Sequence, residues 1–181
     1  ASNPSAGKYW WSFDGSNDYL TAGSVPFQIT DDHLVTLAIR RDSLTGYTDA
    51  FSITGASSTP LMATFECDAA STAFHVFYRS DAPLAVDLAS TLAAGECAVF
   101  TVRQVGNTRV LRKNGVQVAT NTTAIGATTV TTCNVGLRAL ASQYWNGAIG
   151  WVLPLKGTFT DADCLTVERL VGSQFPGMAT F

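Results

Sequence analysis

Short runs of alternating apolar and polar residues, separated by turn-forming residues about every ten positions, most constrain how this chain can fold. Residues 35–40 alternate with a period of two, which places one set of side chains on each face of a strand. The same reasoning predicts strands at 74–78, 97–105, 108–113, 116–120, 128–138 and 148–155. In the last of these, Ile149, Trp151, Leu153 and Leu155 are expected to share one face.

Two of these strands are joined by Asn114-Gly115. A type I′ turn needs positive φ at both central residues, and Asn-Gly meets that need better than other pairs. We therefore predict a β-hairpin at this place.

One stretch near the end of the chain has the signals of a helix. Thr160 stands where an N-cap should be, Asp161 and Asp163 fall in the first turn, and the helix is expected to end near Gly172. Many short strands and a single helix predict an all-β, antiparallel β-sandwich with one short C-terminal helix. Residues 1–8 are expected to be a linker or flexible N-terminus, and residues 9–181 a single domain.

Charge is scarce along the whole chain. Only 14% of the 181 residues are charged, against about 25% in ordinary domains, and the net charge is −3. Nucleic-acid binding, which needs clustered Lys and Arg, is not expected, and no apolar run is long enough for a membrane helix. Because exposed sheet edges are normally protected by charge, especially Lys, we expect partners to cover the edges, as in a homo-oligomer or a larger assembly.

Four cysteines, Cys67, Cys97, Cys133 and Cys164, are spread along the chain without a CxxC pair. This spacing does not favour a structural zinc site. Cys67 and Cys133 fall at inward strand positions, where a thiol behaves as a small apolar side chain. Free thiols are expected, with at least one disulfide as the alternative.

Several motifs occur together and in a fixed order. They are FDGSNDYL at 13–20, RVLRKNGV at 109–116, NVG at 134–136, WNGAI at 145–149 and FTDAD at 159–163. In this order they resemble the laminin-G-like domains of the concanavalin A-like lectin/glucanase superfamily, in the form found in bacteriophage virion proteins. The resemblance implies a jelly-roll sandwich and a virion location, with an extracellular or bacterial-surface location as the alternative.

The resemblance breaks down at one point and leaves metal binding open. Many relatives carry an acidic pair after the WNGAI-like motif, where this chain has Gly150 and Trp151. No cofactor is expected, but calcium is an alternative because some laminin-G-like domains bind it. Its candidate ligands are Asp14, Asp18, Asp31, Asp32 and Asp42, although such residues more often cap their own turns.

Catalytic groups are few. A retaining glucanase needs two carboxylates about 5 Å apart, and the run Glu66-Cys67-Asp68 has Ser71 where a third acid would stand. His33 is interpreted as a polar strand entrance on the surface, and His75 as a solvent-facing or core-edge side chain. We expect no catalytic residues and no enzyme, with a glycosidase as the remotest alternative.

Aromatic residues supply the candidate contacts. Tyr144, Trp145 and Asn146 could form a ligand platform in a turn, although Trp145 could instead close one end of the core. Trp10 and Trp11 are consecutive on a predicted strand and so face opposite ways, which favours a partner contact. The chain is thus predicted to be a non-catalytic recognition module for a glycan or cell-surface receptor. The alternative is a capsid-decoration or assembly domain that binds another virion protein.

Overall fold

The structure, a computed structural model, describes residues 10–23, 25–55, 60–79, 85–137, 143–175 and 177–178, and only the backbone at 60–64 and 85–86. Thirteen strands and one helix lie in these described residues. The predicted leading segment, residues 1–8, lies outside them, and the single domain stays a prediction.

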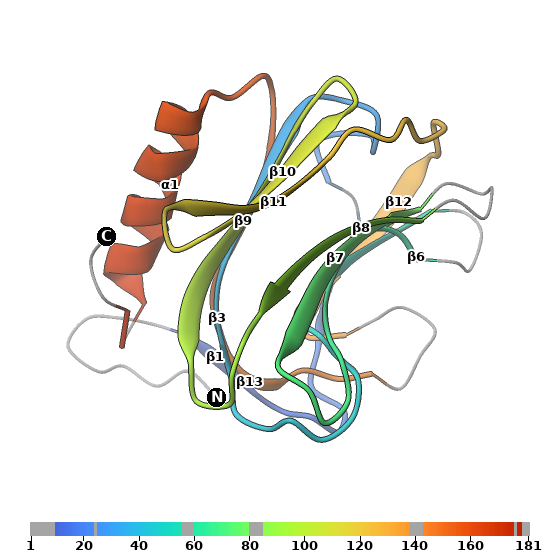
Figure 1. Ribbon diagram of the computed structural model, residues 1–181. Coiled ribbons are helices and arrows are strands. Elements are labelled where there is room, and N and C mark those ends of the chain that lie inside the picture. Colours follow the sequence, from blue (N-terminus) through green and yellow to red (C-terminus); the bar gives the residue numbers. More distant parts are fainter. Residues whose placement is uncertain are drawn as a thin grey trace.

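The strands form two antiparallel sheets (Figure 1). The β3 sheet contains, in spatial order, β1 (Trp11–Asp14), β13 (Asn146–Lys156), β3 (His33–Arg41), β9 (Cys97–Val105), β10 (Thr108–Lys113) and β11 (Val116–Asn121). The β7 sheet contains β2 (Leu20–Ala22), β12 (Val130–Val135), β5 (Phe51–Gly55), β6 (Pro60–Cys67), β7 (Ala73–Arg79) and β8 (Ala85–Thr91), and β4 (Thr48–Asp49) also pairs with β6. The predicted antiparallel sandwich with one C-terminal helix is confirmed.

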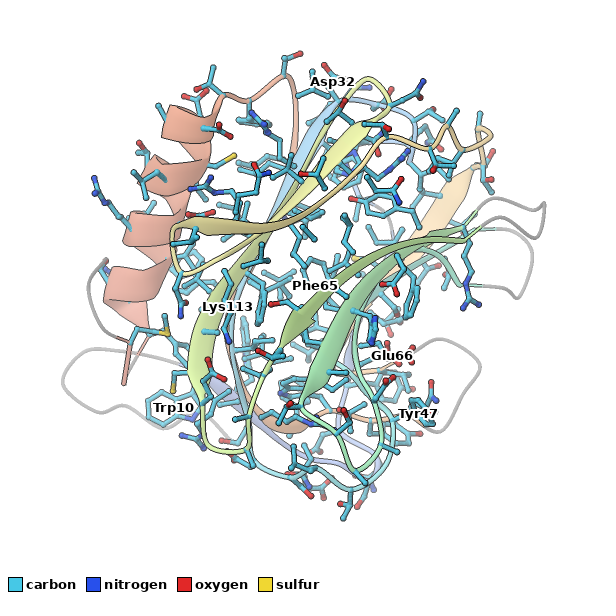
Figure 2. All side chains as sticks on the ribbon, viewed as in Figure 1. Trp10, Asp32, Tyr47, Phe65, Glu66 and Lys113 are labelled. Carbon is cyan, nitrogen blue, oxygen red and sulfur yellow. The ribbon has the colours of Figure 1, made fainter. Side chains whose placement is uncertain are left out.

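The main core fills the space between the two sheets, where Figure 2 shows Phe65. Phe74 of β7 stacks on Phe100 of β9, with ring centroids 3.9 Å apart, so this contact joins the two sheets directly. Cys67 and Cys133 are buried in the same core, as predicted. Each fully buried Phe stabilises the fold by about 1.5–3 kcal/mol relative to an exposed one.

Two local predictions about the backbone are confirmed. Asn114 and Gly115 both have positive φ, 49° and 83°, in the turn between β10 and β11. Helix α1 (Asp161–Gln174) begins after Thr160, whose hydroxyl accepts the Asp163 N–H while the Asp163 carboxylate accepts the Thr160 N–H. This reciprocal capping box satisfies two backbone donors that a helix start leaves without partners. The helix ends two residues beyond Gly172.

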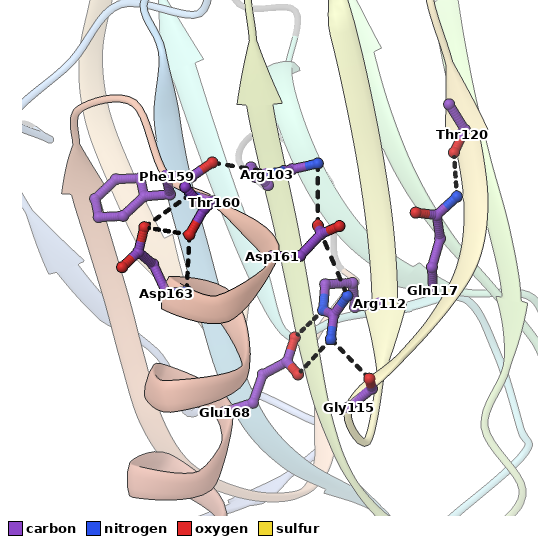
Figure 3. A network of polar contacts seen from close by, with 10 residues as sticks. All are labelled: Arg103, Arg112, Gly115, Gln117, Thr120, Phe159, Thr160, Asp161, Asp163 and Glu168. Atoms are coloured by element: carbon purple, nitrogen blue, oxygen red, sulfur yellow. Dashed lines mark hydrogen bonds and ion pairs between the residues drawn. The ribbon is translucent and has the colours of Figure 1, made fainter.

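Helix α1 covers the outer face of the β3 sheet (Figure 1). A second, smaller apolar cluster forms there from Ala38, Val99, Ala148, Val171 and Phe175. Beside it, the Arg112 Nε donates to Glu168 Oε1 at 2.7 Å, and both side chains are buried (Figure 3). Arg112 also donates to the carbonyl of Gly115, which ties the helix to the β10–β11 hairpin.

The expectation that Ile149, Trp151, Leu153 and Leu155 share one face is wrong. The pairing of β13 with β3 shifts between Ile149 and Trp151, which is a β-bulge at Gly150. Ile149 therefore points into the main core, whereas Trp151 and Leu153 face helix α1. A Cβ at Gly150 would collide with the Phe175 ring. Packing of Phe175 thus explains why a glycine stands at this position.

The surface position expected for His33 is also wrong, because its side chain is fully buried. The ring stacks on Phe27 with a centroid distance of 4.3 Å. Its Nδ1 lies 2.7 Å from the carbonyl oxygen of Asp31, and its Nε2 lies 3.1 Å from the Tyr78 hydroxyl. A carbonyl only accepts, so Nδ1 carries the proton and Nε2 accepts from Tyr78.

Candidate functional site

An exposed pair of tyrosines lies at the end of the sandwich where β3 ends and β13 begins. Tyr19, in the loop between β1 and β2, is 50% exposed, and Tyr144 is half-buried. Their ring centroids lie 6.3 Å apart, and the ring planes meet at 43°. The two rings therefore form an open angle. We call Tyr19, Tyr144 and Asn146 the rim site.

Burial of the next residue holds Tyr144 at the surface. Trp145 is fully buried in the main core, where its Nε1 donates to the carbonyl of Arg40. Its backbone N–H donates to Gly136, and Tyr144 forms a β-bridge with Leu137. The platform interpretation is thus wrong for Trp145, which closes the core because its large apolar ring lowers the free energy most when buried.

Asn146 joins the loop of Tyr19 to the start of β13. Its side-chain Nδ2 donates to the backbone carbonyl of Asp14 at 3.2 Å, and its backbone carbonyl accepts the Asp42 N–H. Gly15 allows this approach, because a Cβ there would lie 2.9 Å from the Asn146 Cβ. Tyr144 thus meets Tyr19, and Asn146 binds the loop that carries Tyr19. Tyr19 lies in the FDGSNDYL motif but was not predicted as a contact.

The candidate calcium ligands are divided between the two ends of the sandwich. Asp14 accepts the Ser16 N–H, and Asp42 forms a bidentate pair with Arg40. At the opposite end, where Figure 2 shows Asp32, that carboxylate accepts from Gly106 and Thr158. These hydrogen bonds hold the pKa of Asp32 below its usual value. Among the described residues, no group of three or more His, Cys, Asp or Glu side chains is placed to hold a metal ion.

The outer face of the β7 sheet differs from that of the β3 sheet, because no described helix covers it. His75, Phe77 and Arg79 follow one another at alternate positions of β7, and all three are half-buried. His75 lies between two carboxylates, 3.0 Å from Asp87 and 3.4 Å from Asp68. It is a half-buried strand residue, as the sequence analysis expected of a core-edge histidine.

The three glutamates have different surroundings. Glu168 pairs with Arg112, and Glu96 pairs with Lys113. Glu66 is buried on β6, opposite His75 in the strand pairing.

All four cysteines lie in the described residues, and no disulfide joins them there. Burial raises the pKa of the Cys67 thiol to about 12 and that of Cys164 to about 11, which keeps both thiols protonated and unreactive.

The two consecutive tryptophans have different surroundings. Trp10 packs against the helix-side cluster, with its ring centroid 6.4 Å from that of Phe175, so its main contact lies within the chain. Trp11 is exposed, and a partner contact there stays a prediction.

An apolar groove lies between helix α1 and β13. It has a volume of about 290 Å³ and is lined by Trp151, Leu153, Leu170, Val171 and Gln174. Trp151 is 44% exposed and Leu170 is 60% exposed, so the groove opens to the surface. In the described part of the chain, no helix has the length and apolar character needed to cross a bilayer.

These features define a jelly-roll β-sandwich with an aromatic pair at its rim. No protein-family profile and no curated protein sequence matches the chain. Solved structures do match its fold, at low sequence identity.

One similar structure is domain 4 of AbnA, a GH43 extracellular arabinanase from Geobacillus stearothermophilus, in complex with arabinotriose. Its TM-score is 0.71 at 13% identity, over 93% of this chain and 81% of that one. Another is the CBM40 of the Ruminococcus gnavus IT-sialidase bound to α2,3-sialyllactose. Its TM-score is 0.62 at 11% identity, over 84% of this chain and 97% of that one. Domains LG4-5 of the mouse laminin α1 chain match with a TM-score of 0.62 at 13% identity, over 81% of this chain and 41% of that one. The predicted jelly roll is confirmed.

Proposed function

We propose that this chain is a non-catalytic glycan-binding module whose ligand contacts the rim site. The observation that carries the proposal is the open angle between the Tyr19 and Tyr144 rings. A tyrosine ring can stack on the apolar C–H face of a pyranose, and its hydroxyl can bond to the sugar at the wet edge. The Asn146 amide, half-buried two residues after Tyr144, adds donor and acceptor capacity.

The comparisons support the same class of function. Two of the similar structures contain a bound oligosaccharide, arabinotriose in one and sialyllactose in the other. The lack of catalysis is supported by the glutamates, since Glu96 and Glu168 are each engaged in an ion pair. Glu66 is buried, and the chain has no third acid at position 71.

Glycan-array screening of the whole chain tests the proposal, followed by titration of the best neutral ligand. Tyr19→Ala and Tyr144→Ala should each weaken binding at least about fivefold, taking as a guide the roughly 1–3 kcal/mol that stacking of a nucleobase on one aromatic ring contributes. Tyr47→Ala is the matched control, because Tyr47 is 49% exposed and belongs to another loop. Absence of binding across the array by folded protein, or full binding by both variants, would contradict the proposal.

We further propose that the module works in a bacteriophage virion, in a tail, fibre or capsid-associated protein. This proposal is supported by the ordered laminin-G-like motifs; an extracellular or bacterial-surface location is the alternative. Its partners would be a host-surface glycan or other virion proteins. Copurification of the full-length protein with virions tests the location, and its absence from purified virions would contradict it.

A second candidate function is assembly, as a capsid-decoration domain that binds another virion protein. The apolar groove between α1 and β13 favours it, because the centres of protein interfaces are poor in charge and rich in aromatic residues. Light scattering after size exclusion gives the mass of the pure chain. A stable oligomer that dissociates in the Leu170→Gln variant would support assembly through this groove, whereas a monomer that binds no virion protein would contradict it.

A further inference from the structure

Three planar side chains lie in a row on the uncovered face of β7. Phe74, Val76 and Tyr78 point into the core and are fully buried, so the alternating residues His75, Phe77 and Arg79 point outward. The His75 and Phe77 rings are nearly parallel, with centroids 5.2 Å apart and planes at 9°. The Arg79 Cζ lies 5.5 Å from the Phe77 centroid, over the ring. We call these three residues the β7 row.

Within the described residues, the Arg79 side chain contacts an aromatic ring but no hydrogen-bond acceptor or ion-pair partner, whereas the other Lys and Arg side chains each have a partner. The others are engaged: Arg40, Arg103, Arg112, Lys113 and Lys156 with carboxylates, Arg41 and Arg109 with backbone carbonyls, and Arg169 with a partner of its own. The contact recorded for Arg79 is the ring of Phe77. Its guanidinium therefore rests against the Phe77 ring, and no acceptor among the described residues occupies its N–H donors.

Two acids near this row, Asp68 and Asp87, contact His75. The Nδ1 of His75 lies 3.0 Å from both oxygens of Asp87, and its Nε2 lies 3.4 Å from Asp68. In the strand pairing, Asp87 stands opposite Phe77, whereas Ala85 stands opposite Arg79. The Asp87 carboxylate therefore lies against His75.

We propose that Arg79 binds the carboxylate of an acidic sugar. A guanidinium offers two parallel N–H donors that match the two oxygens of a carboxylate. The contact with Phe77 restrains the guanidinium before the ligand arrives, which reduces the entropy lost on binding. Asp87 is 43% exposed and can accept from a hydroxyl of the same sugar, while its charge disfavours doubly charged anions. This site lies on the face of the β7 sheet and does not depend on the rim site.

The whole chain titrated with D-glucuronate, followed by heteronuclear NMR, tests this inference. We expect the Arg79 side-chain Nε–Hε signal to shift with a Kd on the order of millimolar. D-glucose, which lacks the carboxylate, and acetate, which lacks the hydroxyls, should each bind at least about tenfold more weakly, since a charge-assisted hydrogen bond contributes about 1.5–3 kcal/mol.

Two substitutions locate the binding. Arg79→Gln should weaken glucuronate binding at least about tenfold, and Arg79→Lys, which keeps the charge but loses the fork, should be intermediate. Arg40→Gln is the matched control, because Arg40 is already paired with Asp42. Phe77→Leu removes the stacking surface and should weaken binding several-fold while the dispersion of the amide spectrum stays unchanged.

Three results would overturn the inference: no glucuronate-dependent shift at Arg79, equal binding of acetate, or unchanged binding by folded Arg79→Gln. Tyr19→Ala separates this site from the rim site. Glucuronate binding should survive that variant even if the rim site binds no glycan.

Discussion

The two outer faces of the sandwich differ in the burial and pairing of their charged side chains. On the β3 sheet, helix α1 covers the strands, and the Arg112–Glu168 pair is buried beneath it. On the β7 sheet no described helix is present, and the His75–Asp87 pair is partly open to water. A charge removed from water must be fully paired, whereas a hydrated charge can lack a protein partner. The covered face therefore serves stability, and the open face can keep a group such as Arg79 for a ligand.

The largest effect is expected when the buried Arg112–Glu168 pair of the covered face loses one partner. Glu168→Ala removes the close carboxylate partner of the buried Arg112 and leaves Asp161, 3.9 Å away, as the remaining one. We expect a loss of about 3–5 kcal/mol in the free energy of unfolding, measured by urea denaturation.

The same deletion on the open face is its control. Asp87→Ala should cost less than about 1 kcal/mol, because water can replace the lost contact. Equal losses for the two variants would mean that the faces do not differ in this respect.

The two histidines extend the comparison to pH. Burial, opposed by the hydrogen bond to Asp31 and reinforced by Arg109, lowers the pKa of His33 to about 4. The unfolded chain has the ordinary histidine value near 6.5, so between these values the unfolded state binds more protons than the native state. Stability contributed by His33 is therefore complete above about pH 6.5 and is lost as the pH falls toward 4, by about 3 kcal/mol.

Denaturation from pH 4 to 7 measures this slope. His33→Phe should flatten it, although the variant loses the hydrogen bond to Tyr78 at every pH. His75→Gln, on the open face, should leave the slope of the His33 transition in place. A slope that persists undiminished in His33→Phe would show that other groups carry it.

A smaller effect is expected at the helix start. Thr160→Ala removes the hydroxyl that accepts the Asp163 N–H, and the expected cost is about 1 kcal/mol. Thr166→Ala is the control, because its hydroxyl donates to a carbonyl within the helix and caps no end. If Thr160→Ala also raises the exposure of the groove residue Trp151, seen by fluorescence, then the cap also positions the groove.

Local rules predicted the fold well because each acted on neighbouring residues. The Asn114-Gly115 turn, the Thr160 cap and the alternation along β7 all follow from short-range sterics and hydrogen bonds. Continuing the inward alternation of β3 back from Val35 would also have placed His33 in the core. The pair of acids before it suggested a surface position instead, although Asp32 bonds to loops.

The errors came from contacts between distant parts of the chain. The bulge at Gly150 reverses the facing of Trp151, and the ring of Phe175, 25 residues later, packs where a side chain at Gly150 would lie. The rim site was half found, because Tyr144 and Asn146 were selected while Tyr19 comes from the other end of the chain. Arg79 could have been noticed as the third outward residue after His75 and Phe77. That it meets no acceptor among the described residues could be recognised only from the positions of the other side chains.

The smallest expected effect concerns the β7 row itself. His75→Gln removes the contacts with Asp68 and Asp87, both of which are partly exposed, so the free energy of unfolding should change by less than about 1 kcal/mol. Glucuronate binding should nevertheless weaken several-fold, because Asp87 would then be released to pair with Arg79 and compete with the ligand. If the β7 row binds a ligand, His75→Gln should weaken glucuronate binding while leaving the free energy of unfolding almost unchanged. A loss above about 2 kcal/mol would instead make His75 a structural group, and the open face would resemble the covered one.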